Sequence, residues 1–169
     1  MMAAVIRYRT LYMSTDPGRA KMNNVENIVV PIDFSSYTEK LIEYALYIGR
    51  SLSAKLHLVH IVELIYGDGM MGMPMSAEFQ LQYEKGMRDR MDELVQELEK
   101  QSPGSTGYIG SGEPVKEIVK YAESLQANLI IISTHGSKGL ESILLGSVAR
   151  RVVKHAHCPV LVMNPFRKQ

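Results

Sequence analysis

The residues best suited to binding chemistry lie at two places in the last third of the chain. The run Ser-Thr-His-Gly at 133–136 follows four aliphatic residues at 129–132. After nine more residues come Gly146 and Ser147, which begin an amphipathic helical pattern. The start of a helix leaves backbone N–H groups without partners at the positive end of the helix dipole, and these attract anions. The spacing therefore predicts a phosphate cradle between the end of a strand and the start of a helix.

Two other groups of residues suggest metal binding, and each has a simpler explanation. His155, His157 and Cys158 could bind zinc, but no fourth ligand is evident, and we expect no metal site there. The loop at 67–75 is rich in methionine, and thioethers can bind Cu(I). Methionine also makes an adaptable apolar surface, so we expect a loop that covers the crevice or touches a partner.

No residues are plainly arranged for catalysis. The chain has no P-loop lysine motif, and no Asp or Glu is clearly placed to activate water. His135 and Glu141 are the residues nearest to the predicted cradle that could orient a water molecule. We therefore predict a binding protein with at most weak hydrolysis of a bound nucleotide, and we assign no catalytic residue.

Strand and helix patterns alternate along the chain and must position these residues. Buried strands are predicted at 27–32, 55–62, 106–109, 129–133 and 159–163, and helices at 38–51, 76–101, 114–125 and 146–155. Alternation of this kind predicts parallel strands joined by right-handed crossovers. The expected fold is a single doubly wound α/β domain, in which five parallel strands are covered by helices on both faces. Ligands of such sheets bind beyond the carboxyl ends of the strands, where the strand order reverses.

Composition agrees with one small globular domain. The chain has 169 residues, a formal net charge of +1 and 46% hydrophobic residues. This charge gives no electrostatic case for nucleic acid or an anionic membrane, and no apolar run is long enough to span a bilayer. The single cysteine excludes an intramolecular disulfide. We expect a cytoplasmic protein, with residues 1–24 as an extension and residues 25–169 as the domain.

Three segments resemble the universal stress protein family. They are IVVPIDFSSYTEKLIEYA at 28–45, KLHLVHIVE at 55–63, and the block at 129–162 that ends in CPVLV. The ATP-binding branch of that family carries Gly-x-x-Gly, nine residues, and then Gly-Ser or Gly-Thr. Gly136, Gly146 and Ser147 match this pattern, and Ser133 replaces its first glycine. A serine would carry a steric cost there only if the position required a positive φ.

The resemblance implies ATP as the ligand, with Mg²⁺ or Mn²⁺ on the phosphates. The backbone of Asp33 and Ile61 would read the adenine edge, Pro31 and Ser133 would border the ribose, and Gly146 would approach the phosphates. The full set of residues expected to bind the nucleotide is Pro31, Ile32, Asp33, Ile61, Ser133, Thr134, His135, Gly136, Ser137, Gly146, Ser147 and Val148. Asp33 could instead be no more than a helix-capping residue at a strand exit, a role compatible with backbone binding. His60 lies within a strand pattern and is expected to be packed.

The resemblance also implies a regulatory protein and a homodimer. In this family the last strand, here 159–163, pairs with its copy across a two-fold axis, which protects an apolar edge. Two alternatives stay open at this point. One is a nucleotide-free member that acts purely as a dimeric interaction module, and the other is a slow ATPase.

Overall fold

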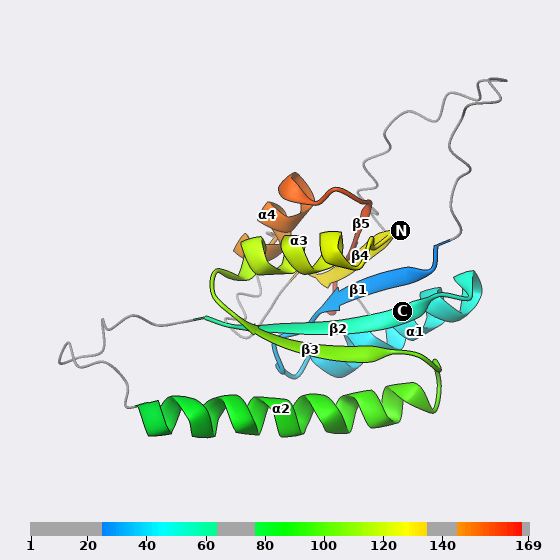
Figure 1. The fold of residues 1–169 in the computed structure, drawn as a ribbon. Helices are drawn as coiled ribbons and strands as arrows, with labels where there is room; N and C mark the ends of the chain where they lie inside the picture. The colour runs from blue at the N-terminus through cyan, green and yellow to red at the C-terminus, as the bar shows by residue number, and fades with distance from the viewer. Residues whose placement is uncertain (1–24, 64–76, 135–144, 167–169) are drawn as a thin grey trace, which may run out of the picture.

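The computed structural model describes residues 25–63, 77–134 and 145–166, which form an α/β fold (Figure 1). The elements alternate as predicted: β1 (Asn27–Pro31), α1 (Thr38–Leu52), β2 (Lys55–Val62), α2 (Ala77–Glu99), β3 (Thr106–Ser111), α3 (Pro114–Ser124), β4 (Leu129–Ser133), α4 (Ser147–His155) and β5 (Val160–Met163). None of the helices in the described ranges is long and apolar enough to cross a membrane.

The strands form one five-stranded sheet in the order β3-β2-β1-β4-β5, and the paired strands are parallel. The chain moves outward from β1 through β2 to β3, and then returns to the other side of β1 with β4. The strand order therefore reverses between β1 and β4, where Ile28 pairs with Leu129 and Val29 with Ile130. Two of the segments singled out in the sequence, the residues after β1 and those at the end of β4, thus flank the reversal point.

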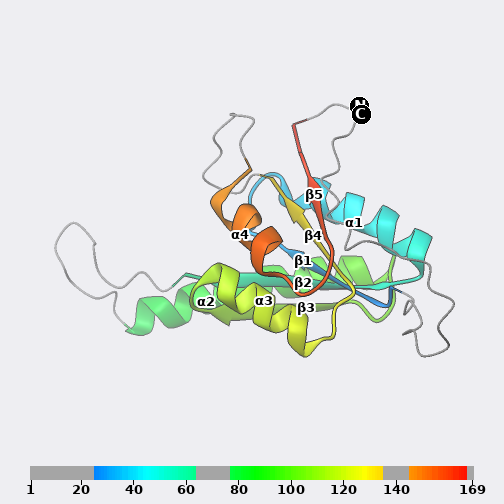
Figure 2. The ribbon, with the colours of Figure 1, turned by 90° about the horizontal axis from the view of Figure 1, so that it is seen from above.

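Helices cover both faces of the sheet, as predicted (Figures 1 and 2). Alternate residues of β1 face opposite sides, so that Ile28 and Val30 pack with residues of α1 and α2, while Val29 packs with residues of α3 and α4. Because both faces are buried, the central strands read as continuous apolar runs in the sequence. The two cores are completed by helix residues such as Leu41, Met91, Ile118 and Val152.

The strand β3 is longer than predicted, extending to Ser111 instead of residue 109. Its sequence, TGYIGS, contains two glycines, which weaken a strand pattern when it is read alone. The structure gives a reason for Gly107: a Cβ there would lie 2.5 Å from Cγ of Met91 and 2.7 Å from Cγ2 of Val95. The close approach of α2 therefore favours glycine, and pairing with β2 continues through both glycines.

A polar cluster holds the amino-terminal end of the sheet together. The two ring nitrogens of buried His57 lie 2.8 Å from Oγ1 of Thr106 and 3.0 Å from Oδ1 of Asn27. The side-chain oxygen of Asn128 accepts hydrogen bonds from the backbone N–H groups of Glu26 and Asn27. These contacts connect β1, β2, β3 and the start of β4 at the end of the sheet opposite to the predicted site.

Candidate functional site

The end of β4 and the start of α4 are joined by one short backbone hydrogen bond. The N–H of Gly146 donates to the carbonyl of Thr134 over 2.8 Å, and the N–H of Thr134 donates to the carbonyl of Met163, also over 2.8 Å. A Cβ on Gly146 would lie 2.8 Å from that same Thr134 oxygen, closer than real Cβ atoms come. The absence of a side chain at Gly146 therefore lets the start of α4 approach the strand end, as the predicted cradle requires.

The helix α4 begins without a side-chain cap among the described residues, with Gly146 at the N-cap position. The neighbouring helix α3 differs, because the carboxylate of Glu113 accepts hydrogen bonds from the N–H groups of Val115 and Lys116. An anionic side chain thus already occupies the start of α3. In α4 the first intrahelical bond to Gly146 comes from Arg150, so the three N–H groups before it have no helical partner. A phosphate would suit these donors.

The residues after β1 form a tight turn directed by Asp33. Its Oδ1 accepts a hydrogen bond from the N–H of Ser35 over 3.1 Å, and Oγ of Ser35 accepts one from Tyr37 over 3.3 Å. Tyr37, not Asp33, is the N-cap residue of α1. Asp33 therefore caps the turn at the strand exit and does not cap the helix α1, so the alternative of a helix-capping role is wrong. Its role in nucleotide binding stays a prediction.

His60 is packed, as the sequence analysis expected. Its Nδ1 lies 2.9 Å from the carbonyl oxygen of Ile32, and its ring lies 4.8 Å from the ring of Phe34 between centroids. The N–H of Ile32 donates to the carbonyl of Val59 over 2.9 Å. Contacts from β2 therefore hold the residues that leave β1.

Ser133, predicted to replace the first glycine of the family pattern, does not have a positive φ. It is the last residue of β4. A serine is therefore sterically acceptable there, because a side chain carries a conformational cost only in the left-handed region. The effect of Ser133 on ATP affinity stays a prediction.

The structure places nine of the twelve predicted site residues. Pro31 and Ile61 are in β1 and β2, Ile32 and Asp33 follow β1, Ser133 and Thr134 end β4, and Gly146, Ser147 and Val148 begin α4. His135, Gly136 and Ser137 lie outside the described residues, as do Glu141 and the methionine-rich loop at 67–75. The described nine belong to neighbouring strands and to the helix joined to β4. Their role in binding remains a prediction.

The segment that suggested a metal site lies within the described residues. The described residues contain no group of three His, Cys, Asp or Glu side chains that could hold an ion. His155 and His157 are exposed, whereas Cys158 is half-buried, and burial raises the pKa of its thiol to about 11. A thiol with this pKa stays protonated near neutral pH.

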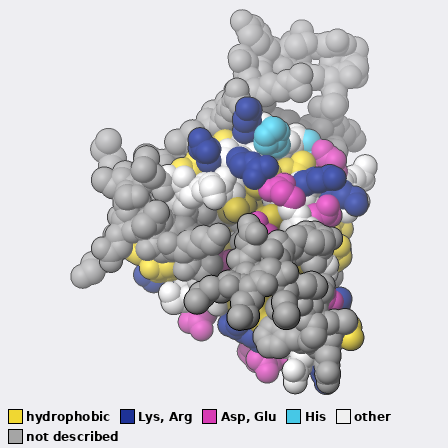
Figure 3. Space-filling view, turned by 90° about the vertical axis from the view of Figure 1, so that its left-hand side faces the viewer, with side chains coloured by type: hydrophobic (Ala, Val, Ile, Leu, Met, Phe, Trp, Pro, Cys, Tyr) yellow, Lys and Arg dark blue, Asp and Glu magenta, His cyan; other side chains and the backbone are white. Residues whose placement is uncertain are grey.

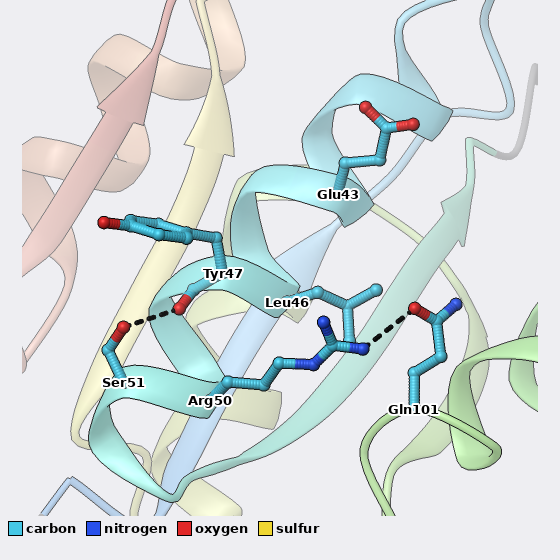
Figure 4. Close-up of a pocket in the computed structure, with 6 residues that line it drawn as sticks. All are labelled: Glu43, Leu46, Tyr47, Arg50, Ser51 and Gln101. Atoms are coloured by element: carbon cyan, nitrogen blue, oxygen red, sulfur yellow. Dashed lines mark hydrogen bonds between the residues drawn. The ribbon is translucent and has the colours of Figure 1, made fainter.

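A hollow of about 500 Å³ lies on α1, away from the strand ends (Figure 4). Arg50 donates a hydrogen bond to Gln101 over 3.0 Å at its border, and Tyr47 is 68% exposed. The lining residues are Glu43, Leu46, Tyr47, Arg50, Ser51 and Gln101. Five of these residues lie in α1 and Gln101 follows α2. None of them is a predicted nucleotide-binding residue, so this hollow is separate from the candidate site.

Sequence reasoning missed two residues beside the site, Phe34 and Arg90. Phe34 has a φ of 55°, which is unusual for a residue other than glycine. The guanidinium of Arg90, from α2, lies 4.7 Å from the centre of the Phe34 ring. Neither feature can be read from the sequence, because Phe has no preference for this backbone conformation and Arg90 is 56 positions away.

Comparisons with known proteins agree with this fold. The model of the universal stress protein family matches residues 24–164. The universal stress protein MJ0531 of Methanocaldococcus jannaschii is 33% identical over 151 residues, which cover 87% of this chain and 86% of that protein. The solved structure of MJ0577, from the same organism, is similar with a TM-score of 0.66 and 27% identity, covering 86% of this chain and 99% of that chain.

A second solved structure shows the same fold with a nucleotide. It is a universal stress protein from Archaeoglobus fulgidus in complex with dAMP, with a TM-score of 0.55 and 24% identity, covering 82% of this chain and 98% of that chain. At this identity the similarity establishes the fold, and the bound dAMP is a property of that protein.

Proposed function

Because this chain belongs to the universal stress protein family, we propose that it binds ATP at the carboxyl ends of β1, β2 and β4 and acts as a regulatory module in a stress response. The observation that carries the proposal is the approach of Gly146 to Thr134, which sets the uncapped start of α4 against the end of β4. This arrangement offers backbone donors to phosphate oxygens.

The other end of the nucleotide would lie beside the residues that leave β1. Asp33 lies at the reversal of the strand order, next to β2, and its backbone and that of Ile61 would read the adenine edge. Pro31 and Ser133 would border the ribose. The triphosphate would bring Mg²⁺ or Mn²⁺, held mainly by phosphate oxygens and water, as Mg²⁺ commonly is. The nucleotide complex of the similar Archaeoglobus structure supports a nucleotide over other anions.

The proposed module is a cytoplasmic homodimer that pairs through β5. This strand is at the edge of the sheet, and all four of its residues are apolar and only half-buried. An apolar edge strand of this kind favours pairing with another strand. The proposed division of the chain is an extension over residues 1–24 and a single domain over residues 25–169.

Mass spectrometry of the nucleotide released from freshly purified protein tests the central proposal, with calorimetry on the nucleotide-stripped protein. We expect ATP or a close relative at one mole per chain. If stripped protein shows no heat of binding with ATP and a divalent ion, the nucleotide-free interaction module is the better description. Single-turnover hydrolysis addresses the ATPase alternative, since turnover on the order of one per second would lie within the usual range for enzymes.

A further inference from the structure

Phe34 follows the predicted adenine-reading residue and has a strained backbone. Its φ of 55° lies in the left-handed region, which favours glycine. Such a conformation persists in a side-chain-bearing residue only when surrounding contacts hold it, and it often occurs at functional sites. The contacts that hold Phe34 are therefore of interest for the candidate site.

Phe34 lies between two side chains from different elements. The ring of His60, in β2, is 4.8 Å away between centroids, and the guanidinium of Arg90, in α2, is 4.7 Å from the Phe34 ring centre. A cation at this distance is attracted to an aromatic ring. Arg90 also donates a hydrogen bond through Nη2 to the carbonyl oxygen of Phe34 over 3.3 Å. A single side chain of α2 thus contacts both the ring and the backbone of Phe34.

The same contacts restrict the backbone on both sides of Asp33. The carbonyl of Ile32 is hydrogen-bonded to His60, and the carbonyl of Phe34 accepts from Arg90. The side chain of Asp33 accepts from the N–H of Ser35, which closes the turn. The orientation of the Asp33 backbone is therefore set by contacts from β2 and α2 together with its own turn.

We propose that Arg90 is a positioning residue of the candidate nucleotide site: it holds Phe34 in the left-handed conformation and so orients the backbone of Asp33. The importance of the Asp33 backbone orientation for ATP binding rests on the proposed function. In this proposal Arg90 acts through Phe34, whose ring and carbonyl oxygen it contacts. The proposed site thereby depends on α2. Through Met91 and Leu98, this helix packs on the same face of the sheet as α1.

The test compares Arg90→Met with Arg88→Met. Arg88 is exposed on the same helix and has no side-chain hydrogen bond or ion pair with the described residues, so its substitution removes the same charge without the Phe34 contact. ATP affinity is measured by calorimetry, and amide hydrogen exchange of Ser35 is measured on the nucleotide-free protein. We expect Arg90→Met to weaken ATP binding about three- to tenfold and to speed exchange at Ser35, while Arg88→Met changes neither.

Repeating Arg90→Met in a Phe34→Gly variant distinguishes positioning through Phe34 from a direct contact of Arg90 with the nucleotide. Glycine adopts a φ near 55° without support, so adding Arg90→Met to Phe34→Gly should change affinity less than about twofold. An Arg90→Met effect of full size in that background would overturn the proposal that Arg90 acts by holding the strained Phe34, because glycine needs no such support and only the hydrogen bond to the carbonyl of residue 34 would remain. Equal behaviour of the Arg90 and Arg88 variants would overturn it as well.

The exchange measurement keeps the two proposals distinguishable. If the parent protein binds no ATP, the proposed function fails, and exchange at Ser35 alone decides whether Arg90 holds the turn. Faster exchange in Arg90→Met than in Arg88→Met supports the positioning role, and equal exchange in the two variants rejects it.

Discussion

Gly146 and Thr134 are joined by a 2.8 Å hydrogen bond, and a Cβ on Gly146 would lie 2.8 Å from the same Thr134 oxygen. The bond and the lack of a side chain together set the distance between the start of α4 and the end of β4. Because the obstructing atom belongs to the backbone, an added methyl group cannot be accommodated by a side-chain rotation.

Gly146→Ala is therefore expected to displace the start of α4. Overpacking of this kind costs about 1–3 kcal/mol of unfolding free energy, and the shifted N–H groups should weaken ATP binding more than about tenfold. Urea unfolding and calorimetry measure the two effects. Gly86→Ala in α2 is the matched control, because a Cβ there meets nothing within 4 Å. Full ATP affinity in the Gly146 variant would reject the proposed cradle.

Ser133→Gly tests the replacement in the family pattern. Since Ser133 lies in β4 without a positive φ, glycine offers no relief of strain there. We expect ATP affinity within about threefold of the parent, and a loss of about 0.5–1 kcal/mol in stability from glycine in a strand. A much larger loss of affinity, with stability in this range, would identify the serine hydroxyl as a needed contact.

Val162→Pro is expected to convert a dimer into a monomer. Residues 159 and 163 accept hydrogen bonds from β4, so by alternation along the strand the N–H of Val162 points to the open edge of the sheet. Proline there removes a donor to a partner strand and leaves the pairing with β4 in place. Light scattering at micromolar concentration gives the mass, and circular dichroism checks the fold. A monomeric parent would contradict the proposed dimer.

His57 is expected to make the fold sensitive to acid. Burial, and secondarily the positive charge of Lys55, lowers the pKa of His57 below its usual value of 6.5. Tyr121, from α3, does not contribute to this pH dependence. Its pKa is raised, chiefly by burial, so its hydroxyl stays neutral in this pH range. A lowered folded-state pKa means that the unfolded chain takes up the proton first. The contribution of His57 is therefore fully present above pH 6.5 and decreases as the pH falls toward and through its folded-state pKa.

Urea unfolding at several pH values measures this effect. The unfolding free energy of the parent should fall below pH 6.5, and His57→Gln should show a smaller decrease. His157→Gln is the control, since this residue is exposed and lies outside the buried polar cluster. The same slope in the His57 variant and the parent would show that the buried cluster does not govern acid sensitivity.

The surface over the helices α3 and α4 carries a group of basic side chains that the net charge does not reveal (Figure 3). Arg150, Arg151 and Lys154 are exposed on α4, and Arg151 pairs with Glu113 over 2.9 Å. Whole-chain composition averages this group with the acidic residues of α2. Local charge depends on which helices pack together, so it follows from the tertiary structure.

The sequence by itself determined the order of the elements and predicted a site where two of them meet. Apolar runs such as 129–132 must be buried on both faces, and this requirement alone predicts central parallel strands. Gly146 and Ser147 were recognisable because the start of a helix is a local property of the chain. The predicted helices and strands differ from the observed ones mainly in their first and last residues, where local preferences compete with packing.

Only the tertiary structure decided which distant residues contact one another. The pairing of β1 with β4, the approach of α2 to Gly107 and the contact of Arg90 with Phe34 each join segments far apart in the chain. The left-handed backbone of Phe34 opposes its local preference, so no local pattern could predict it. Such a conformation is selected by the sum of contacts in the folded protein, and those contacts exist only after the sheet and its helices have assembled.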